Sequence, residues 1–265
     1  MADAAAHEVI DDAGAAAPWL VLVHGVSQDR RVWDRQVEAF RDAYRLILID
    51  MPGHGASAAM PGPFGAVEFG DAIGASLDAA GIERAVYWGT HLGATAGLVL
   101  ACAQPTRFSA MILEGPVYPG RSMPALNDFL AEAAATMRTA GIEAAREIWW
   151  TRGPWFDVMR ANPVTCRAAA QRAIVDDFGG APWQDTGLAS RPMPPLDAAI
   201  RGLPCPVLLM NGEHDAPDFL AASADLLQVL AHGRRVLIPG GGGFPFWEFP
   251  DAVNAEVRCF LNGLV

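Results

Sequence analysis

Six stretches of the chain are apolar at nearly every position and have the length of a β-strand. Continuous apolar runs, as opposed to alternating ones, are typical of strands that are buried on both faces of a sheet. Stretches with helical spacing separate and follow these runs, which predicts right-handed crossovers and a mostly parallel sheet. The expected strands cover 19–23, 44–50, 85–88, 110–114, 207–210 and 235–239, and the expected helices cover 32–41, 67–80, 94–104, 217–231 and 250–264.

The alternation is interrupted between Glu114 and Pro206. This segment has three helix-like stretches, a proline-rich linker and half of the chain's eight tryptophans. We therefore expect a helical cap at 117–203, inserted over the strand ends of an α/β core formed by 1–116 and 204–265. The tryptophans either line a pocket beneath the cap or only attach the cap to the core. The stretches are 124–140, 141–150 and 163–177, the linker is 191–195, and the tryptophans are Trp149, Trp150, Trp155 and Trp183.

The composition argues against several classes of function. Hydrophobic residues make up 52% of the 265 positions, which is incompatible with a disordered chain. The formal net charge of −11 argues against nucleic-acid binding, because phosphate recognition depends on a basic surface. The four cysteines are scattered and no histidines have metal-ligand spacing. We therefore expect reduced thiols and no bound metal.

The first 18 residues are acidic and rich in alanine, and they lack the basic and apolar regions of a secretory signal. The longest apolar stretch, 85–103, is broken by glycines, threonines and a histidine, so we do not expect it to span a membrane. We expect a cytoplasmic protein with no membrane contact. The sequence leaves the oligomeric state open, a homo-oligomer included.

The most informative motif is Gly89-Thr-His-Leu-Gly93, between an expected strand and an expected helix. A hydrolase carries Gly-x-Ser-x-Gly in this context, where a strained turn from strand to helix holds the nucleophile at the edge of the sheet. The central residue here is His91, which has no hydroxyl. The motif thus predicts a fold while leaving the chemistry open.

The ordered motifs together resemble the α/β-hydrolase superfamily, in the capped branch that includes enol-lactone hydrolases, C–C hydrolases and small esterases. The resemblance covers nearly the whole chain from Trp19 to Leu264. It implies an α/β-hydrolase fold, with helices on both faces of a mostly parallel central sheet and an inserted helical cap. The motifs that carry it are Leu22-Val-His-Gly25 followed by Trp33, and the segments 50–57, 81–85, 211–215 and 238–250.

The resemblance implies a Ser-Asp-His triad, from which this chain departs at two positions. Asp215 matches the acid, in a Gly-x-x-Asp loop after an expected strand. The histidine is expected in Pro-x-x-Gly-His-Phe-Pro, where this chain has Gly243. Because His91 replaces the serine, both the nucleophile and its base are missing, and acyl-serine chemistry is not available.

Other parts of a carbonyl-binding site are expected to persist. The backbone N–H groups of Leu92 and Val26 are placed to hold a developing oxyanion. His91 begins a helix, whose positive end keeps the imidazole neutral and suited to act as a base or nucleophile. We hypothesise that its ring leans into the space left at Gly243 and reaches Asp215, directly or through a water. Glu114, at the end of a strand, is an alternative carboxylate partner.

The pocket between cap and sheet is expected to take a small, largely apolar substrate, aromatic or acyl-bearing, without a cofactor. Its candidate residues are His24, Glu114, Trp150, Gly243 and Phe244. His24 matches a turn position of the family, where it orients its loop or contacts the substrate. Two functions are left open: an enzyme that uses His91 for ester or lactone hydrolysis or for a lyase or oxygenase step, and a non-catalytic ligand-binding protein.

Overall fold

The computed structural model describes residues 2–184 and 188–264. Within these residues, one seven-stranded sheet has the order β1–β3–β2–β4–β5–β6–β7 and is parallel except for β1, which pairs antiparallel to β3. The six expected strands are confirmed as β2 to β7. The bounds are β1 (His7–Ile10), β2 (Trp19–Val23), β3 (Arg45–Ile49), β4 (Ala85–Thr90), β5 (Phe108–Glu114), β6 (Val207–Gly212) and β7 (Gly233–Ile238).

The first strand was not predicted. It lies at the edge of the sheet and pairs with β3 along its whole length, with His7 opposite Ile49 and Ile10 opposite Leu46. Glu8 and Val9 are exposed, so the strand lacks the continuous apolar run by which the others are recognised. Short edge strands with charged residues are common because they discourage edge-to-edge pairing.

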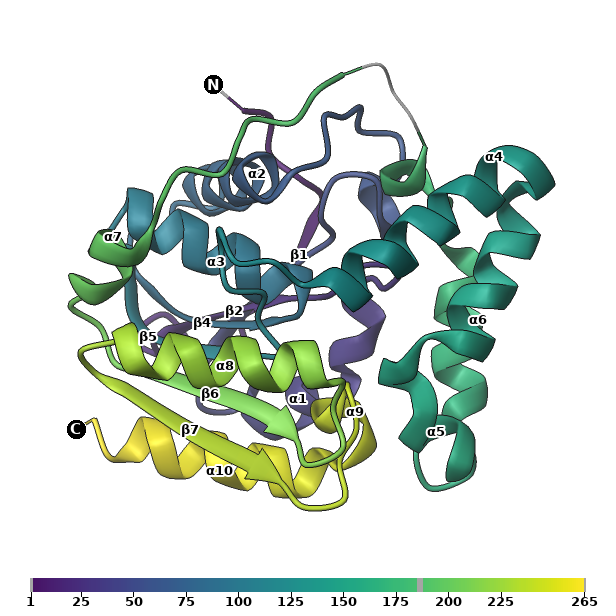
Figure 1. Ribbon diagram of the computed structural model, residues 1–265. Helices are drawn as coiled ribbons and strands as arrows, with labels where there is room; N and C mark the ends of the chain where they lie inside the picture. Colours follow the sequence, from purple (N-terminus) through teal and green to yellow (C-terminus); the bar gives the residue numbers. More distant parts are fainter. Residues whose placement is uncertain (1, 185–187, 265) are drawn as a thin grey trace.

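Helices cover both faces of the sheet (Figure 1). One face is covered by α2 (Ala66–Ala79), α3 (Leu92–Ala103), α7 (Asp197–Arg201) and α8 (Pro217–Val229), and the other by α1 (Asp34–Phe40) and α10 (Pro250–Asn262). The predicted fold class, an α/β-hydrolase fold with a mostly parallel sheet, is confirmed by this arrangement. The short helices are η1 (Arg30–Trp33), η2 (Gly55–Ser57) and α9 (Pro245–Glu248).

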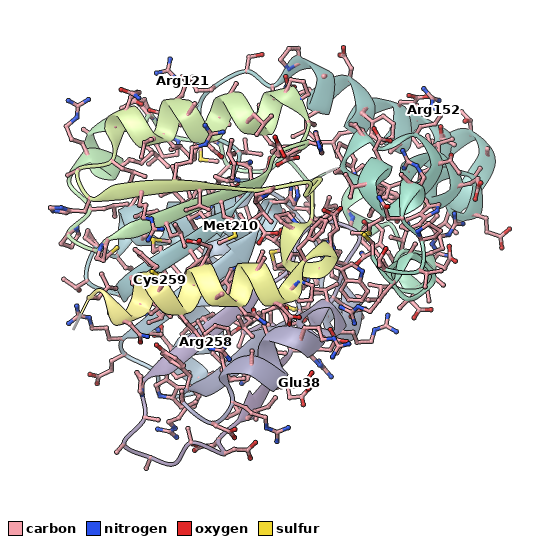
Figure 2. The ribbon with its side chains drawn as sticks, turned by 90° about the horizontal axis from the view of Figure 1, so that it is seen from below. Glu38, Arg121, Arg152, Met210, Arg258 and Cys259 are labelled. Carbon is pink, nitrogen blue, oxygen red and sulfur yellow. The ribbon has the colours of Figure 1, made fainter. Side chains whose placement is uncertain are left out.

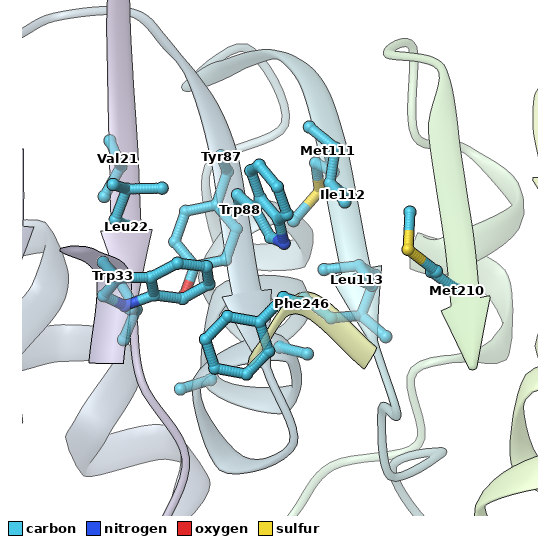
Figure 3. Packing of buried hydrophobic residues seen from close by; sticks show 14 of the residues in the cluster. Val21, Leu22, Trp33, Tyr87, Trp88, Met111, Ile112, Leu113, Met210 and Phe246 are labelled. Carbon is cyan, nitrogen blue, oxygen red and sulfur yellow. The ribbon is translucent and has the colours of Figure 1, made fainter. Parts of the chain in front are cut away.

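The core is packed on both sides of β4. Tyr87 and Trp88 point to opposite faces, as successive strand residues do (Figure 3). The Tyr87 hydroxyl donates to the carbonyl of Gly93 in α3 at 2.6 Å. Trp88 packs edge-on against Trp33, with ring centroids 5.4 Å apart, and Phe246 covers Trp33 at 4.6 Å. Both faces of the strand that carries the site are therefore fixed by buried aromatic side chains.

The inserted segment forms a helical cap at the carboxyl ends of the parallel strands (Figure 1). Its main helix, α4 (Pro124–Arg152), contains a break at Gly141, where φ is 86°, so the two predicted helices at 124–140 and 141–150 are its two halves. The cap continues through η3 (Pro154–Phe156), α5 (Asp157–Ala161), α6 (Ala168–Asp177) and η4 (Ala181–Trp183).

The predicted boundaries at 116/117 and 203/204 stay a prediction. Helix α7 falls inside the predicted cap range but packs against α3 and α8 of the core. Residues 1, 185–187 and 265, which also fall in the predicted domains, lie outside the described residues. In the described part of the chain, no helix is both long enough and apolar enough to cross a membrane.

Candidate active site

The strand-to-helix turn after β4 keeps the backbone of a nucleophile elbow. His91 has φ 48° and ψ −108°, a strained conformation for a residue with a side chain. A Cβ atom on Gly89 would lie 2.6 Å from the carbonyl carbon of Gly93, and one on Gly93 would lie 2.4 Å from the carbonyl oxygen of Val23. Both positions therefore require glycine. Only the residue at the apex differs from the pattern of the family hydrolases.

The imidazole of His91 is buried, with 6% of the residue exposed. Its Nε2 atom lies 2.6 Å from the carbonyl oxygen of Gly243, and its ring packs against Phe219 and Phe244 at 4.5 and 4.7 Å between centroids. Because a carbonyl can only accept, the contact assigns the hydrogen to Nε2 and the lone pair to Nδ1.

Burial also fixes the charge of this ring. Desolvation lowers the pKa of His91 to about 4, although the hydrogen bond to Gly243 acts in the opposite direction. The imidazole is thus neutral at physiological pH, as expected. The largest physical cause is burial among aromatic rings, and the ring also lies at the N-terminus of α3, as the sequence suggested.

The space expected beside Gly243 is filled from the cap. A Cβ atom at this position would lie 2.4 Å from Cβ and 2.7 Å from Cα of Trp155. A histidine side chain cannot be placed here without moving the cap. The expectation that the His91 ring occupies a vacated space is therefore corrected: Trp155 takes that space, and His91 reaches only the Gly243 carbonyl.

Asp215 is buried in the loop after β6, but its hydrogen bonds are local. Its carboxylate accepts from Nδ2 of Asn211 at 2.9 Å and from the backbone N–H of Ala216 at 2.8 Å. The expected direct hydrogen bond from His91 is replaced by the one to Gly243. Burial raises the pKa of Asp215 to about 7.

Two further carboxyl groups are buried nearby. Glu114 accepts from the backbone N–H of Phe246 at 3.3 Å, and Glu248 accepts from that of Gly242 at 2.5 Å. Burial raises the pKa of Glu248 to about 8 and that of Glu114 well above its ordinary value, and the neighbouring carboxylates act in the same direction. Glu248 was not predicted from the sequence. The one feature that could have pointed to it is its place as the only acidic residue in the aromatic segment 244–249.

The two expected oxyanion donors are both at the site. Val26 and Leu92 line the same cavity as His91. Among the described residues, neither backbone N–H has a protein acceptor. The loop that carries Val26 is held by Gln28, whose Oε1 accepts from the Gly25 N–H at 3.0 Å, and by Trp149, whose Nε1 donates to the Ser27 hydroxyl at 2.7 Å.

A cavity of about 210 Å³ lies between these groups and the cap. Three of the four cap tryptophans and the predicted Phe244 line it, together with residues of α2, α4 and α8 that were not predicted as pocket residues. The lining residues are Val26, Phe64, Phe69, His91, Leu92, Val117, Leu126, Leu130, Trp149, Trp155, Pro182, Trp183, Phe219 and Phe244.

Four predicted pocket residues do not line the cavity: Gly243, whose carbonyl accepts from His91, and three that lie elsewhere. Trp150 packs on Phe156 at 4.7 Å, because neighbouring helix residues point in different directions and Trp149 takes the inward place. His24 uses both ring nitrogens on the backbone: Nδ1 donates to the Gly25 carbonyl at 2.7 Å and Nε2 accepts from the Met51 N–H at 3.1 Å. It therefore orients its loop. Glu114 is fully buried behind the cavity.

Comparison with known proteins settles the family. Residues 18–250 match the family model of the alpha/beta hydrolase fold. The chain belongs to this family. The 2-succinyl-6-hydroxy-2,4-cyclohexadiene-1-carboxylate synthase of Enterobacter sp. (strain 638) is 31% identical, and the match covers 92% of each chain. A pimeloyl-[acyl-carrier protein] methyl ester esterase of Nitrosomonas europaea is 27% identical over 92% of this chain and 94% of that protein.

Solved structures in the alpha/beta hydrolase family share the same fold. MenH from S. aureus superimposes with a TM-score of 0.83 at 21% identity, covering 97% of this chain and 98% of that one. The enol-lactonase from Burkholderia xenovorans LB400 gives 0.81 at 23% identity, covering 97% and 96%. At these identities the likeness concerns the fold alone, so the chemistry must be argued from the residues of this chain.

Proposed function

We propose that this chain is a cofactor-free enzyme that removes a proton from a small, largely apolar carbonyl compound, with His91 as the base. One observation carries the proposal: the Nε2–H of His91 is bound to the Gly243 carbonyl, while Nδ1 is left to accept at a cavity that also holds two unpaired backbone N–H groups. This arrangement supplies a base and an oxyanion site without a serine.

In the proposed step, the substrate carbonyl oxygen accepts from the N–H groups of Val26 and Leu92. Nδ1 of His91 takes a proton from the carbon beside the carbonyl. That C–H bond breaks, its electron pair becomes the enolate held by the two amides, and the proton becomes an N–H of the imidazolium. The imidazolium then returns a proton to the carbon, or to a group that leaves from the next carbon.

The low pKa of the base limits which protons it can remove. A base with a pKa of about 4 is weak, so the oxyanion donors must supply much of the stabilisation. The substrate proton must itself be acidic, as on a carbon flanked by a carbonyl and an aromatic ring or by two carbonyls. In this proposal the Gly243 carbonyl orients His91, and Asp215 does not.

Hydrolysis is a variant of the same proposal, in which Nδ1 deprotonates a water or attacks the carbonyl itself. Esterase and enol-lactonase relatives act on esters and lactones by name. In this chain either route would be confined to activated esters and lactones, because the Ser-His pair that drives acyl transfer is missing.

A non-catalytic ligand-binding protein is the second candidate. The elbow has no serine, Trp155 fills the place of the family histidine, and Asp215 bonds to Asn211 and Ala216, so no hydrolytic triad can be re-formed by small movements. In such a protein the cavity binds its ligand without turnover. A cytoplasmic location stays a prediction from the sequence, and the oligomeric state stays open.

The test is hydrogen–deuterium exchange at the benzylic CH₂ of phenylacetone in D₂O, followed by proton NMR. The wild-type chain should accelerate exchange over buffer, and His91→Ala and His91→Gln should remove at least about 100-fold of that acceleration. His232→Ala is the matched control, because His232 is exposed and distant from the elbow in the chain. Parallel assays use p-nitrophenyl esters and lactones. Binding without exchange or hydrolysis would establish the second candidate.

A further inference from the structure

Among the residues that the structure describes, the lining of the cavity includes no cationic side chain. Of the fourteen lining residues, thirteen are apolar or aromatic, and the remaining one is His91. Since burial keeps this imidazole neutral, it supplies no positive charge to a ligand at physiological pH. A carboxylate or phosphate that entered the cavity would lose its hydration without gaining a cation, which is strongly unfavourable.

The polar groups of the cavity are gathered at one end. The N–H groups of Val26 and Leu92 and the Nδ1 atom of His91 all belong to the elbow and the loop beside it. The indole N–H of Trp149, on the cap side, is already bound to Ser27. A ligand that matches this distribution has one polar end and an otherwise apolar body.

The arginines of the cap face away from the cavity. Arg152 pairs with Glu132 on the outside, and Figure 2 shows it at the periphery of the molecule. Arg146 donates to the Phe178 carbonyl at 2.8 Å, and Arg160 donates to that of Gly153 at 3.0 Å. None of these three residues lines the cavity. Behind the elbow lie buried carboxyl groups, which would repel an anion further when ionised.

The size of the cavity limits the ligand to about one ring. An apolar cavity of about 150 Å³ takes up benzene in another protein. The volume of about 210 Å³ here leaves room for a benzene-sized ring with a short substituent. The aromatic walls suit such a ring, because aromatic pairs gain from tilted and edge-to-face contacts beyond their buried area.

We propose that the substrate is an uncharged, single-ring aromatic or similarly unsaturated carbonyl compound that carries no carboxylate or phosphate. The carbonyl in this statement rests on the proposed function. That the substrate is uncharged and has a single ring is argued from the lining and volume of the cavity, and binding measurements alone can test it.

The first test compares two pairs of para-substituted phenylacetones that match in size and differ in charge: the carboxylate with the carboxamide, and the aminomethyl derivative, an ammonium ion at neutral pH, with the ethyl derivative. Binding to the full chain is followed by the fluorescence of the tryptophans that line the cavity. Each neutral derivative should bind at least about tenfold tighter than its charged counterpart. Equal or tighter binding of the carboxylate overturns the proposal, and so does tighter binding of the cation, which would make the cavity an aromatic cage for cations.

The second test adds the missing charge. Leu130 lines the cavity from α4 and is only partly buried, so polar substitutions there are tolerable. Leu130→Arg should improve binding of the carboxylate at least about tenfold relative to Leu130→Gln, and Leu130→Gln should keep the preference for the neutral ligand. Both variants are checked by thermal melting. If a correctly folded Leu130→Arg variant gains no affinity for the carboxylate, the missing cation is not what excludes anions.

Failure of this proposal is distinguishable from failure of the proposed function. His91→Gln should lose exchange but keep the preference for the neutral ligand over the carboxylate, because the other thirteen lining residues, all apolar or aromatic, are unchanged. Selective binding of the neutral ligand without any exchange would remove the catalytic role and leave the ligand class standing. Exchange together with tighter binding of the carboxylate would leave the catalytic role standing and overturn the proposed ligand class.

Discussion

The Nε2 atom of His91 lies 2.6 Å from the carbonyl oxygen of Gly243, across 152 positions of the sequence. The sequence resemblance places these two residues where hydrolases of the family are expected to carry serine and histidine. The two replacements therefore produce one contact, which joins the turn after β4 to the loop after β7. This contact fixes the tautomer of the elbow histidine and leaves its second nitrogen as an acceptor.

The pH dependence of activity should report this histidine. Desolvation lowers the pKa of His91 to about 4, and the working form is the neutral ring. Phenylacetone exchange should stay constant from pH 8 to about 5.5 and fall with a midpoint near 4. A loss of half the activity near pH 6.5, the ordinary value for histidine, would show that the base is solvated or is another group. The profile is measured with binding followed in parallel, so that loss of affinity is separated from loss of rate.

Replacing Asp215 by asparagine should leave the exchange rate within about threefold of the wild type. Its carboxylate bonds to Asn211 and Ala216, so it has no direct part in orienting His91. In a working triad, loss of the carboxylate costs about 10⁴-fold in kcat. A loss above about 100-fold in a folded Asp215→Asn variant would restore Asp215 as the orienting acid.

The same variant should change how stability depends on pH. Burial raises the pKa of Asp215 from an ordinary 3.8 to about 7, so the folded state holds a proton that the unfolded state releases. The stability from this proton is complete below pH 3.8 and is lost as the pH rises through about 7. Thermal melts of the wild type and Asp215→Asn between pH 5 and 8 should show the variant gaining relative stability, by at most about 1.4 kcal/mol per pH unit. A difference that does not change with pH would contradict this.

Gly243→Ala should destabilise the protein by about 1–3 kcal/mol, because the new Cβ would lie 2.4 Å from Cβ of Trp155. It should also slow exchange, since the carbonyl that holds His91 would move. Gly179→Ala is the matched control, because a Cβ there has no neighbouring atom within 4 Å. Chemical denaturation measures both variants. Equal stability of the two variants would mean that Trp155 of the cap does not pack closely against the backbone of Gly243.

Ser27 offers a separate test of how the cap supports the oxyanion loop. Its hydroxyl accepts from the Trp149 indole, and its φ of 62° strains any residue with a side chain. Ser27→Ala and Ser27→Gly both leave the indole N–H unpaired, at a cost of about 1–3 kcal/mol. The glycine variant relieves the backbone and should be about 1 kcal/mol more stable than the alanine variant. If denaturation curves show that the glycine variant is less stable than the alanine variant, the backbone at residue 27 is not strained.

The fold could be predicted because its signals are local. Continuous apolar runs locate β2 to β7, and Gly89 and Gly93 locate the elbow, whose close contacts accept no larger residue. Gly141 marks the break in α4 for a different reason: its φ of 86° is one that residues with a side chain rarely adopt. Strand β1 gave no such signal, because its stability comes from pairing with β3 rather than from burial of its side chains.

The site was predicted only in part, because its decisive contacts are long-range. The position of His91 follows from the elbow, and the oxyanion role of the Leu92 and Val26 N–H groups stays a prediction. The Gly243 carbonyl was not foreseen as a partner, since a run of glycines suggests empty space and its filling by Trp155 depends on how the cap folds back. The choice of Trp149 over Trp150 as a cavity residue depends on the rotation of α4 after its break at Gly141.

The central claim, that the elbow carries a neutral imidazole with a free Nδ1, is tested most directly by ¹⁵N NMR of the His91 ring in the full chain. The signals are assigned by their absence in His91→Gln and followed from pH 3 to 8. We predict a protonated Nε2 and an unprotonated Nδ1 at pH 7, with a titration midpoint near 4. A proton on Nδ1 at pH 7, or a midpoint at or above 6.5, would contradict the role of His91 as the base of this site.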